Sequence, residues 1–178
     1  RRDVIPRGIE YCDQAIRLRK QESRPHALKA LLLSSLGKVE VPGGALDELL
    51  LAQSKEPDDF YVFLTRGLTR LKQAAQIDEA RVGSEQLRQK EKFLVQAIRE
   101  FKQSFDKKPT REAKINQGQA HAEKARLLAA RGGTQAKEEA ERERDLAITA
   151  YTEVLLEFPS YPKALRGLAK VRMESDEL

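Results

Sequence analysis

Few residues in this chain of 178 are of types that usually perform chemistry. Histidine and cysteine, the common metal ligands and nucleophiles, are represented only by His26, His121 and Cys12. The histidines share no ligand spacing with each other or with the cysteine, so the sequence does not indicate a zinc, haem or iron–sulfur site. A single thiol also cannot form a disulfide within the chain. We therefore expect no cofactor, no metal and no catalytic residue.

Two short motifs share part of an enzyme signature. His121-Ala122-Glu123 has the His-x-Glu spacing of zinc deaminases, but those sites also require a pair of cysteines, which the chain lacks. Gly132-Gly133-Thr134 lacks the Gly-Lys-Ser/Thr of a phosphate loop and is typical of a turn, with Thr134 as the N-cap of the following helix. We expect His121 to lie at the surface or in a groove.

The other conspicuous side chains have structural explanations. Cys12 lies in an apolar stripe with Ile9 and Ile16, which favours buried packing over a redox role. Asp58-Asp59 follows Pro57 at an expected helix start, where acidic side chains interact favourably with the helix dipole. The following aromatic residues are expected to pack in the core rather than to stack on nucleic-acid bases: Phe60, Tyr61, Phe63, Phe101, Tyr151 and Tyr161.

Composition narrows the classes of partner. Apolar residues make up 40% of the chain, with no run near the roughly 18 needed to cross a bilayer, so we expect no membrane insertion. The net charge of +5 arises from 33 basic and 28 acidic residues. Residues 1–29 hold eight basic and four acidic side chains, which leaves the rest nearly neutral. A nucleic-acid binder would need a basic stripe along its whole length, so we expect no nucleic acid as partner.

All secondary-structure elements of the chain are expected to be helices. Long stretches of Ala, Leu, Glu, Lys and Arg alternate with short Pro- or Gly-containing turns, and no alternating β-branched run or hairpin signal occurs. The short turns indicate that neighbouring helices are antiparallel. The expected helices span residues 2–20, 26–37, 43–55, 58–73, 85–107, 111–131, 134–158 and 161–175.

An internal repeat appears when the chain is aligned on three prolines. The pattern is Ala-x3-bulky-x2-small-x4-Pro, and its first three positions fall within about 60° of one another around a helix. A weaker copy without the proline is Gly8, Cys12, Ala15 and Lys20. The three full copies are Ala45, Leu49, Ala52 and Pro57; Ala97, Phe101, Ser104 and Pro109; and Ala147, Tyr151, Val154 and Pro159.

This pattern resembles the second helix of the tetratricopeptide repeat, with its small, aromatic and small residues before a terminal proline. Two stretches are similar to the first helix of that repeat: Phe60, Leu64, Gly67 and Leu68 after Pro57, and Tyr161, Ala164, Leu168, Ala169 and Val171 after Pro159. The resemblance covers nearly the whole chain. It departs from the family in its period, because successive prolines are 52 and 50 residues apart rather than about 34.

The extra residues are best placed between the two helices of each long repeat, at 73–92 and 126–145. These inserts carry balanced charge, four acids and four bases in the first and five of each in the second. Balanced charge is typical of solvated helix faces. We expect both helices of each pair to be lengthened into ordered arms, through which self-association is possible.

The resemblance implies an all-α, right-handed superhelix of antiparallel helix pairs, with about eight helices, two lengthened pairs and a single domain over residues 1–178. It also implies a non-catalytic scaffold that binds a peptide or helix of a partner protein on the concave face formed by the first helices. The expected groove residues are Lys29, Thr65, Thr69, Asn116, Glu123, Arg166 and Lys170.

Alternatives from other classes are a helical-repeat nucleic-acid-binding module and the regulatory domain of a larger enzyme. The chain opens on what resembles a second-type helix, so we expect a fragment of a longer protein. Its last four residues, Ser-Asp-Glu-Leu, are similar to an endoplasmic-reticulum retention signal, but so short a motif has little specificity. The sequence therefore does not fix the compartment.

Overall fold

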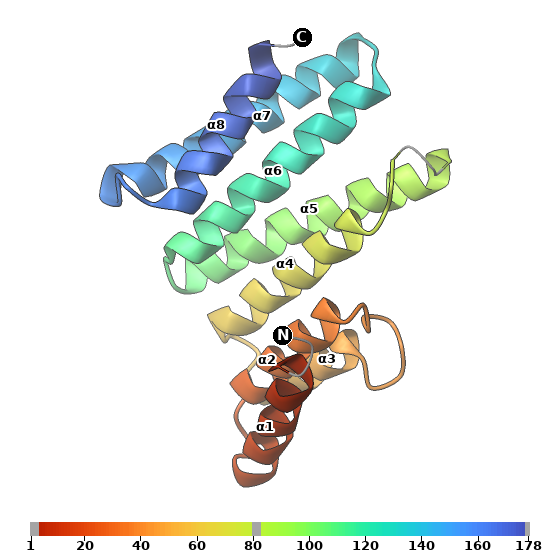
Figure 1. Ribbon diagram of the computed structural model, residues 1–178, viewed down its shortest axis with the longest axis vertical. Coiled ribbons are helices and arrows are strands. Elements are labelled where there is room, and N and C mark those ends of the chain that lie inside the picture. Colours follow the sequence, from red (N-terminus) through yellow and green to blue (C-terminus); the bar gives the residue numbers. More distant parts are fainter. Residues whose placement is uncertain (1–3, 80–82, 177–178) are drawn as a thin grey trace.

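The computed structural model describes residues 4–79 and 83–176, with side chains as far as Glu174, and the described residues form eight α-helices and no strand (Figure 1). The last two residues of the Ser-Asp-Glu-Leu tail lie outside the described residues. The helices are α1 (Val4–Leu18), α2 (Arg24–Ser35), α3 (Ala45–Lys55), α4 (Phe60–Ala75), α5 (Ser84–Lys107), α6 (Arg111–Arg131), α7 (Thr134–Glu157) and α8 (Pro162–Asp176).

The predicted all-α class is confirmed, and the helix ends agree with the expected ones to within two residues. The start of α2 differs because this helix includes Pro25 in its first turn instead of beginning after it. Proline is tolerated there because the first N–H groups of a helix have no partner within the helix. The apolar faces and the turns thus determine the helices as expected.

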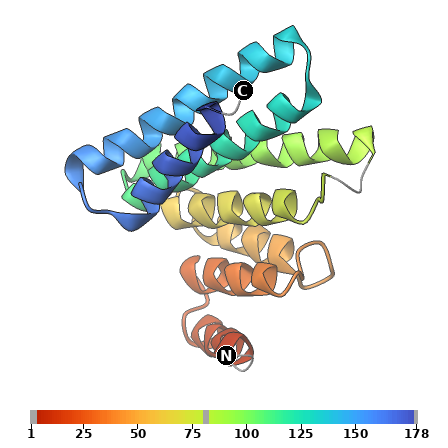
Figure 2. The same ribbon diagram turned by 45° about the horizontal axis from the view of Figure 1, so that its top comes forward.

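Alternate helices form a continuous inner layer. Helix α2 packs on α4, α4 on α6 and α6 on α8, while each outer helix packs on the inner helices next to it in the chain. Within the described residues, the backbones of the outer helices α1, α3, α5 and α7 do not come close to one another. The short helices α1–α3 form one end of the molecule and the long helices α5–α7 the other (Figures 1 and 2).

The repeat positions read from the sequence are the buried contact stripe of each outer helix. Ala45, Ala97 and Ala147 have no exposed surface, and the bulky residue that follows each of them is at most 3% exposed. Each of the three helices ends two residues before its proline, at Lys55, Lys107 and Glu157. The spacing of the repeat positions therefore marks the residues of each outer helix that pack against its inner partner.

Glycines on the inner helices accept the aromatic rings of the outer helices. A Cβ atom added to Gly67 of α4 would lie 2.5 Å from Cε1 of Phe101, which is fully buried. Tyr151 of α7 lies against Gly118 of α6 and also against Gly167 of α8, so one ring contacts both neighbouring inner helices. These positions are glycine because any side chain would occupy the volume of the ring.

Two helix pairs contain the same buried ionic arrangement. In the first, Oε2 of Glu48 lies 2.7 Å from Nδ1 of His26, and Oε1 lies 2.6 Å from Nζ of Lys29. In the second, Glu143 contacts His121 at 2.6 Å and Lys124 at 2.8 Å through the corresponding atoms. Each histidine stands three residues before the lysine and 22 before the glutamate.

This arrangement corrects the expectation that His121 lies at the surface or in a groove, since it is 8% exposed and held by Glu143. Burial alone would raise the pKa of Glu143, but the hydrogen bonds from His121 and Lys124 outweigh it and the pKa is lowered. The carboxylate thus gives both inner-helix side chains a hydrogen-bond partner, and Lys124 also pairs with Glu139 at 3.0 Å.

The α4–α5 pair holds its carboxylate differently. Oε1 of Glu100 lies 3.2 Å from Nη2 of Arg66, whereas Oε2 is buried without a hydrogen-bond partner. Burial raises the pKa of Glu100, and the positive charges of Arg66, Arg99 and Arg70 only partly oppose that rise. Arg70 instead stacks over the ring of Phe93, 5.7 Å from its centroid.

The long arms are helical, but not in the symmetric form we expected. Both α6 and α7 are long, whereas in the other pair only α5 is lengthened and α4 ends at Ala75. The backbone leaves the helix there because Nζ of Lys90 binds the carbonyl of Ile77 at 3.1 Å and the carboxylate of Glu79 at 2.7 Å. These contacts fold the end of α4 back onto α5.

Helix caps confirm one sequence interpretation and correct another. Asp59 caps α4, accepting a hydrogen bond of 3.0 Å from the Tyr61 amide. Thr134 is the first residue of α7 rather than its N-cap, because Gly133 takes that place without a side-chain bond. Gly132 and Gly133 have φ values of 73° and 84°, so the predicted turn is present and requires glycine.

Replacing Gly67 by alanine should lower the free energy of unfolding by about 1–2 kcal/mol, because overpacking against Phe101 outweighs the gain in helix propensity. The matched control is Gly8→Ala in α1, where the added Cβ meets only a flexible methyl of Leu32 at 3.0 Å. Urea denaturation should show Gly8→Ala to be neutral or stabilising. A Gly67→Ala variant as stable as the parent chain would contradict the ring contact, and Phe101→Leu should restore part of the loss.

Replacing Glu143 by glutamine should destabilise the fold by about 1–2 kcal/mol at neutral pH, since Lys124 keeps only the more exposed carboxylate of Glu139 as its counter-charge. Because the folded-state pKa of Glu143 is lowered below 4.5, this stabilisation is present above that pH and is lost as the pH falls through the folded value. The two proteins should therefore converge in acid, measured by urea denaturation across pH.

The control for that comparison is Glu153→Gln on the same helix. Glu153 pairs with Lys114 but is 48% exposed, so its replacement should cost less than about 1 kcal/mol. Equal losses at the two positions would show that burial of the Glu143 carboxylate contributes nothing.

Candidate partner-binding surface

The structure corrects two of the expected groove residues. Thr65 and Thr69 of α4 are 1% and 0% exposed, so neither faces an open surface. The hydroxyl of Thr69 donates to the carbonyl of Thr65 at 3.0 Å, inside the helix. They are buried because α4 is covered by α2, α3, α5 and α6 together. The expectation treated α4 as a helix with one free face, and it has none at these positions.

Lys29 lies at the contact of three helices. Its Nζ atom binds Oδ1 of Asp13 on α1 at 2.7 Å and Oε1 of Glu48 on α3 at 2.6 Å. Burial alone would lower the pKa of Lys29, but these two hydrogen bonds outweigh it and the pKa is raised. The side chain is 19% exposed, and its ammonium group is already paired with two carboxylates within the fold.

The remaining predicted residues lie on α6 and α8, and the structure brings two of them together. Nζ of Lys170 lies 3.5 Å from Oε1 of Glu123, which also binds Arg126. Arg166 is exposed, and its Nε donates to the carbonyl of Pro162 at 3.4 Å. Asn116 is half-buried on α6. Their role in binding a partner stays a prediction.

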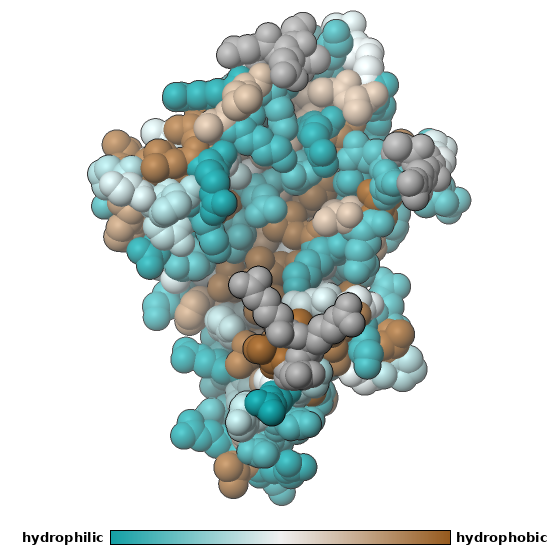
Figure 3. All heavy atoms as spheres, in the orientation of Figure 1, coloured by the Kyte–Doolittle hydropathy of each residue, from teal (hydrophilic) through white to brown (hydrophobic). Residues whose placement is uncertain are grey.

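The inner face of these helices is mainly polar. In Figure 3, hydrophilic side chains cover most of the visible face over α6 and α8, and hydrophobic ones gather in the middle between α4 and α6. This face therefore offers many charged groups but little continuous apolar surface.

An apolar hollow of about 490 Å³ lies at the other end of the molecule, between α1, α2 and α4. Leu28 is 42% exposed and Tyr11 is 68% exposed, although both are large and apolar. Nearly all of the hollow's surface is carbon, and its lining residues are Tyr11, Cys12, Ala15, Arg19, Glu22, Arg24, Pro25, Leu28, Phe60 and Tyr61.

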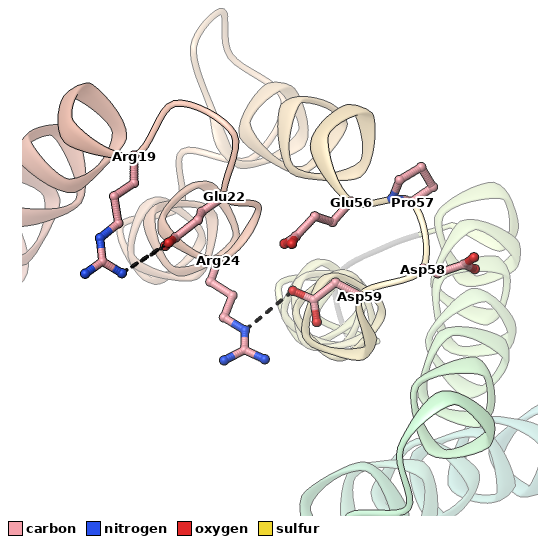
Figure 4. Close-up of a pocket in the computed structure, with 7 residues that line it drawn as sticks. All are labelled: Arg19, Glu22, Arg24, Glu56, Pro57, Asp58 and Asp59. Carbon is pink, nitrogen blue, oxygen red and sulfur yellow. Dashed lines mark hydrogen bonds and ion pairs between the residues drawn. The ribbon is translucent and has the colours of Figure 1, made fainter.

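A second hollow of about 640 Å³ continues from the first, since Arg19, Glu22 and Arg24 line both. Figure 4 shows Glu56 and Asp59 facing the same space, with Arg24 beside Asp59 and Glu22 turned toward Arg19. This polar hollow is completed by Pro57 and Asp58. The two hollows together are called the corner groove below.

Most charges of the polar hollow are paired. Arg19 lies 3.1 Å from Glu22, and Arg24 lies 3.6 Å from Asp59. Asp58 points away toward α5 (Figure 4), where it pairs with Lys107 at 2.5 Å. Glu56 is exposed and forms no ion pair with a described cation.

Ser23 joins Glu56 to Asp59. It has no exposed surface, and its hydroxyl lies 2.6 Å from Oδ2 of Asp59 and within hydrogen-bonding distance of Oε2 of Glu56. The Ser23 amide also donates to Glu56 at 3.1 Å. One hydroxyl proton serves two carboxylates, so a concentration of negative charge faces the hollow.

Phe60 lines the apolar part of the corner groove. The Arg24 guanidinium lies 5.8 Å from the centroid of its ring, and Nζ of Lys108 lies 4.9 Å from it. Neighbouring Tyr61 has a raised pKa because it is buried and lies near the Cys12 thiol. The wall of the groove is thus fixed by cation–π contacts and burial.

The sequence interpretation missed this site. It assigned Phe60 and Tyr61 to the core and Asp58-Asp59 to capping, which is correct for Asp59, but three helices must be placed before the groove exists. The exposed Tyr11 and Leu28 next to the Arg-Pro turn are the signal that could have indicated it. No group of three or more potential metal ligands occurs among the described residues, and no described helix is long and apolar enough to span a membrane.

Comparisons with known proteins add a coarse structural likeness. A monomeric mutant of IFIT1 solved with Gppp-AAAA aligns with 97% of this chain at 15% identity and a TM-score of 0.46. A further IFIT1 mutant, solved with m7Gppp-AAAA, gives the same values. The chain spans 43% of the length of these proteins. No protein-family model and no curated protein matches the chain.

The thiol of Cys12 should react slowly in the folded protein. Cys12 is 4% exposed, and burial together with the charge of Asp13 raises its pKa, so little thiolate is accessible. Titration with a chromogenic disulfide reagent should show slow modification that becomes immediate in denaturant. As a control, the Cys12→Ser/Leu18→Cys variant places the thiol at a position that is 84% exposed and should react at once. Equally fast reaction of both proteins would place Cys12 at an open surface.

Proposed function

We propose that this chain is a non-catalytic scaffold that binds a segment of a partner protein in the corner groove. The observation that supports this most directly is the exposed apolar surface of Tyr11 and Leu28 beside a polar hollow. A soluble surface that leaves large apolar side chains exposed around a cavity gains free energy when a partner covers them. The inner face of α6 and α8 provides further polar contacts to the same partner.

The absence of catalysis is part of the proposal. Both histidines are held by glutamates, Glu48 buried and Glu143 largely so, and Cys12 is a buried thiol with a raised pKa. These groups have structural partners, so they are poorly placed to transfer protons or attack a substrate. Binding suits the groove better than reaction.

A tetratricopeptide-like architecture with a right-handed superhelix is the finer form of the proposal. Its support is the repeated stripe of small and bulky residues, the glycine contacts of Phe101 and Tyr151, and the continuous layer of α2, α4, α6 and α8. Arrays of this kind leave one extended surface for a partner, since each helix pair contacts only its neighbours.

A photoreactive amino acid placed at Leu28 in the full-length protein should form discrete cross-links to a partner protein in the cell of origin. The matched control is the same amino acid at Leu156 of α7, which is 78% exposed but lies outside the groove. We expect the cross-linked species at Leu28 to be absent at Leu156. Gel analysis after irradiation, followed by mass spectrometry, provides the measurement.

Three results would contradict the proposal. The first is the same pattern at both positions, and the second is no cross-link at Leu28. The third is a cross-linked species that disappears with nuclease, which would assign the groove to nucleic acid and favour the nucleic-acid-binding alternative.

A further inference from the structure

We infer that the corner groove selects a peptide segment in which a large apolar side chain is followed closely by lysine or arginine. This inference rests on the proposed function and specifies the chemistry of the partner. The apolar side chain would fill the hollow between α1, α2 and α4, and the cation would lie in the polar hollow at the start of α4.

The apolar hollow has the size and lining of a side-chain pocket. Its volume of about 490 Å³ exceeds that of any single side chain, so it would take an aromatic or branched aliphatic residue together with part of its backbone. The floor is formed by buried Cys12 and half-buried Phe60 and Tyr61, which are held in place by the fold. A buried aromatic or aliphatic anchor in a preformed pocket is the usual centre of such an interface.

The charge of the polar hollow determines which sign of charge the bound segment should carry. Arg19 and Arg24 are matched by Glu22 and Asp59, while Asp58 turns toward Lys107. Glu56 remains exposed without a cation and shares the Ser23 hydroxyl with Asp59. The uncompensated charge is therefore negative. Lys108 stacks on Phe60 and lines neither hollow, so it does not reverse this balance.

The two parts of the groove are continuous, so both residues can belong to one short segment. Arg19, Glu22 and Arg24 line both hollows, and their long side chains can move aside without disturbing a helix. An acidic segment would instead place its carboxylate beside Glu56 and Asp59, where like charges repel. Electrostatics thus favours a basic segment over an acidic one. The apolar hollow favours a segment with a large apolar side chain over one that is polar throughout.

Selection from a random peptide library against the full chain tests this directly. Enriched peptides should carry Leu, Ile, Phe, Tyr or Trp with Lys or Arg a few residues away, and binding of the best peptide should weaken as salt is raised. Enrichment of acidic residues, or no enrichment of any sequence, would overturn the inference.

Two variants then locate the site by fluorescence anisotropy with the best selected peptide. Glu56→Gln keeps an acceptor for Ser23 and removes the charge, so binding should weaken about threefold to fivefold. Leu28→Ser should weaken it about tenfold through lost apolar contact. Leu156→Ser is the control and should leave binding unchanged. Thermal unfolding of each variant separates a binding effect from a loss of fold, and unchanged binding in both folded groove variants would contradict the inference.

The outcomes distinguish this inference from the proposed function. Protein cross-links at Leu28 together with acidic selected peptides would leave the proposed function in place and overturn the basic specificity. Absence of both cross-links and selected peptides would overturn the proposed function and the basic specificity together.

Discussion

The close contact of an outer-helix aromatic ring with an inner-helix glycine is the constraint on which the long helix pairs depend. Phe101 occupies the space of a missing side chain at Gly67, and Tyr151 does so at Gly118 and Gly167. Because the ring lies on the backbone of its neighbour, the two axes are held at a short and fixed distance. Tyr151 also joins two inner helices at once, so the same contact that closes one pair sets the position of the next. Burial raises the pKa of this tyrosine to about 12 and keeps it uncharged there.

The buried charges play a different part, since they specify which helices pair and in what register. Glu48 and Glu143 each bind a histidine and a lysine three residues apart on the inner helix, and a shift by one residue would break these contacts. Such pairs are weak evidence for stability in themselves, because desolvation offsets much of their attraction. The carboxylates do not follow the register of the sequence repeat: Glu48 and Glu100 stand three residues after Ala45 and Ala97, whereas Glu143 stands four residues before Ala147. Each ionic contact therefore fixes its own helix pair.

The sequence could predict the helices because their information is local. Proline after each outer helix, small residues along its stripe and glycine at the turns act within a few residues, and the ends agree with the structure to within two residues. Lys29, Thr65 and Thr69 were assigned to the groove because helical spacing alone shows which face a residue occupies but not what covers that face. Burial of α4 by four neighbours, and the capture of Lys29 by Asp13 and Glu48, depend on contacts between distant segments.

The corner groove follows from the same packing that forms the array. Helices α1 and α4 both pack on α2, yet within the described residues their backbones do not approach each other closely. The space between them is therefore a hollow lined by all three helices, with Cys12 of α1 and Phe60 and Tyr61 of α4 as its floor. Its polar continuation arises because the turn into α4 must place acids near the helix start, where Asp59 caps the backbone and Glu56 holds Ser23. An apolar pocket beside excess negative charge thus results from ordinary helix capping at a junction of three helices, and it needs no residue whose only role is binding.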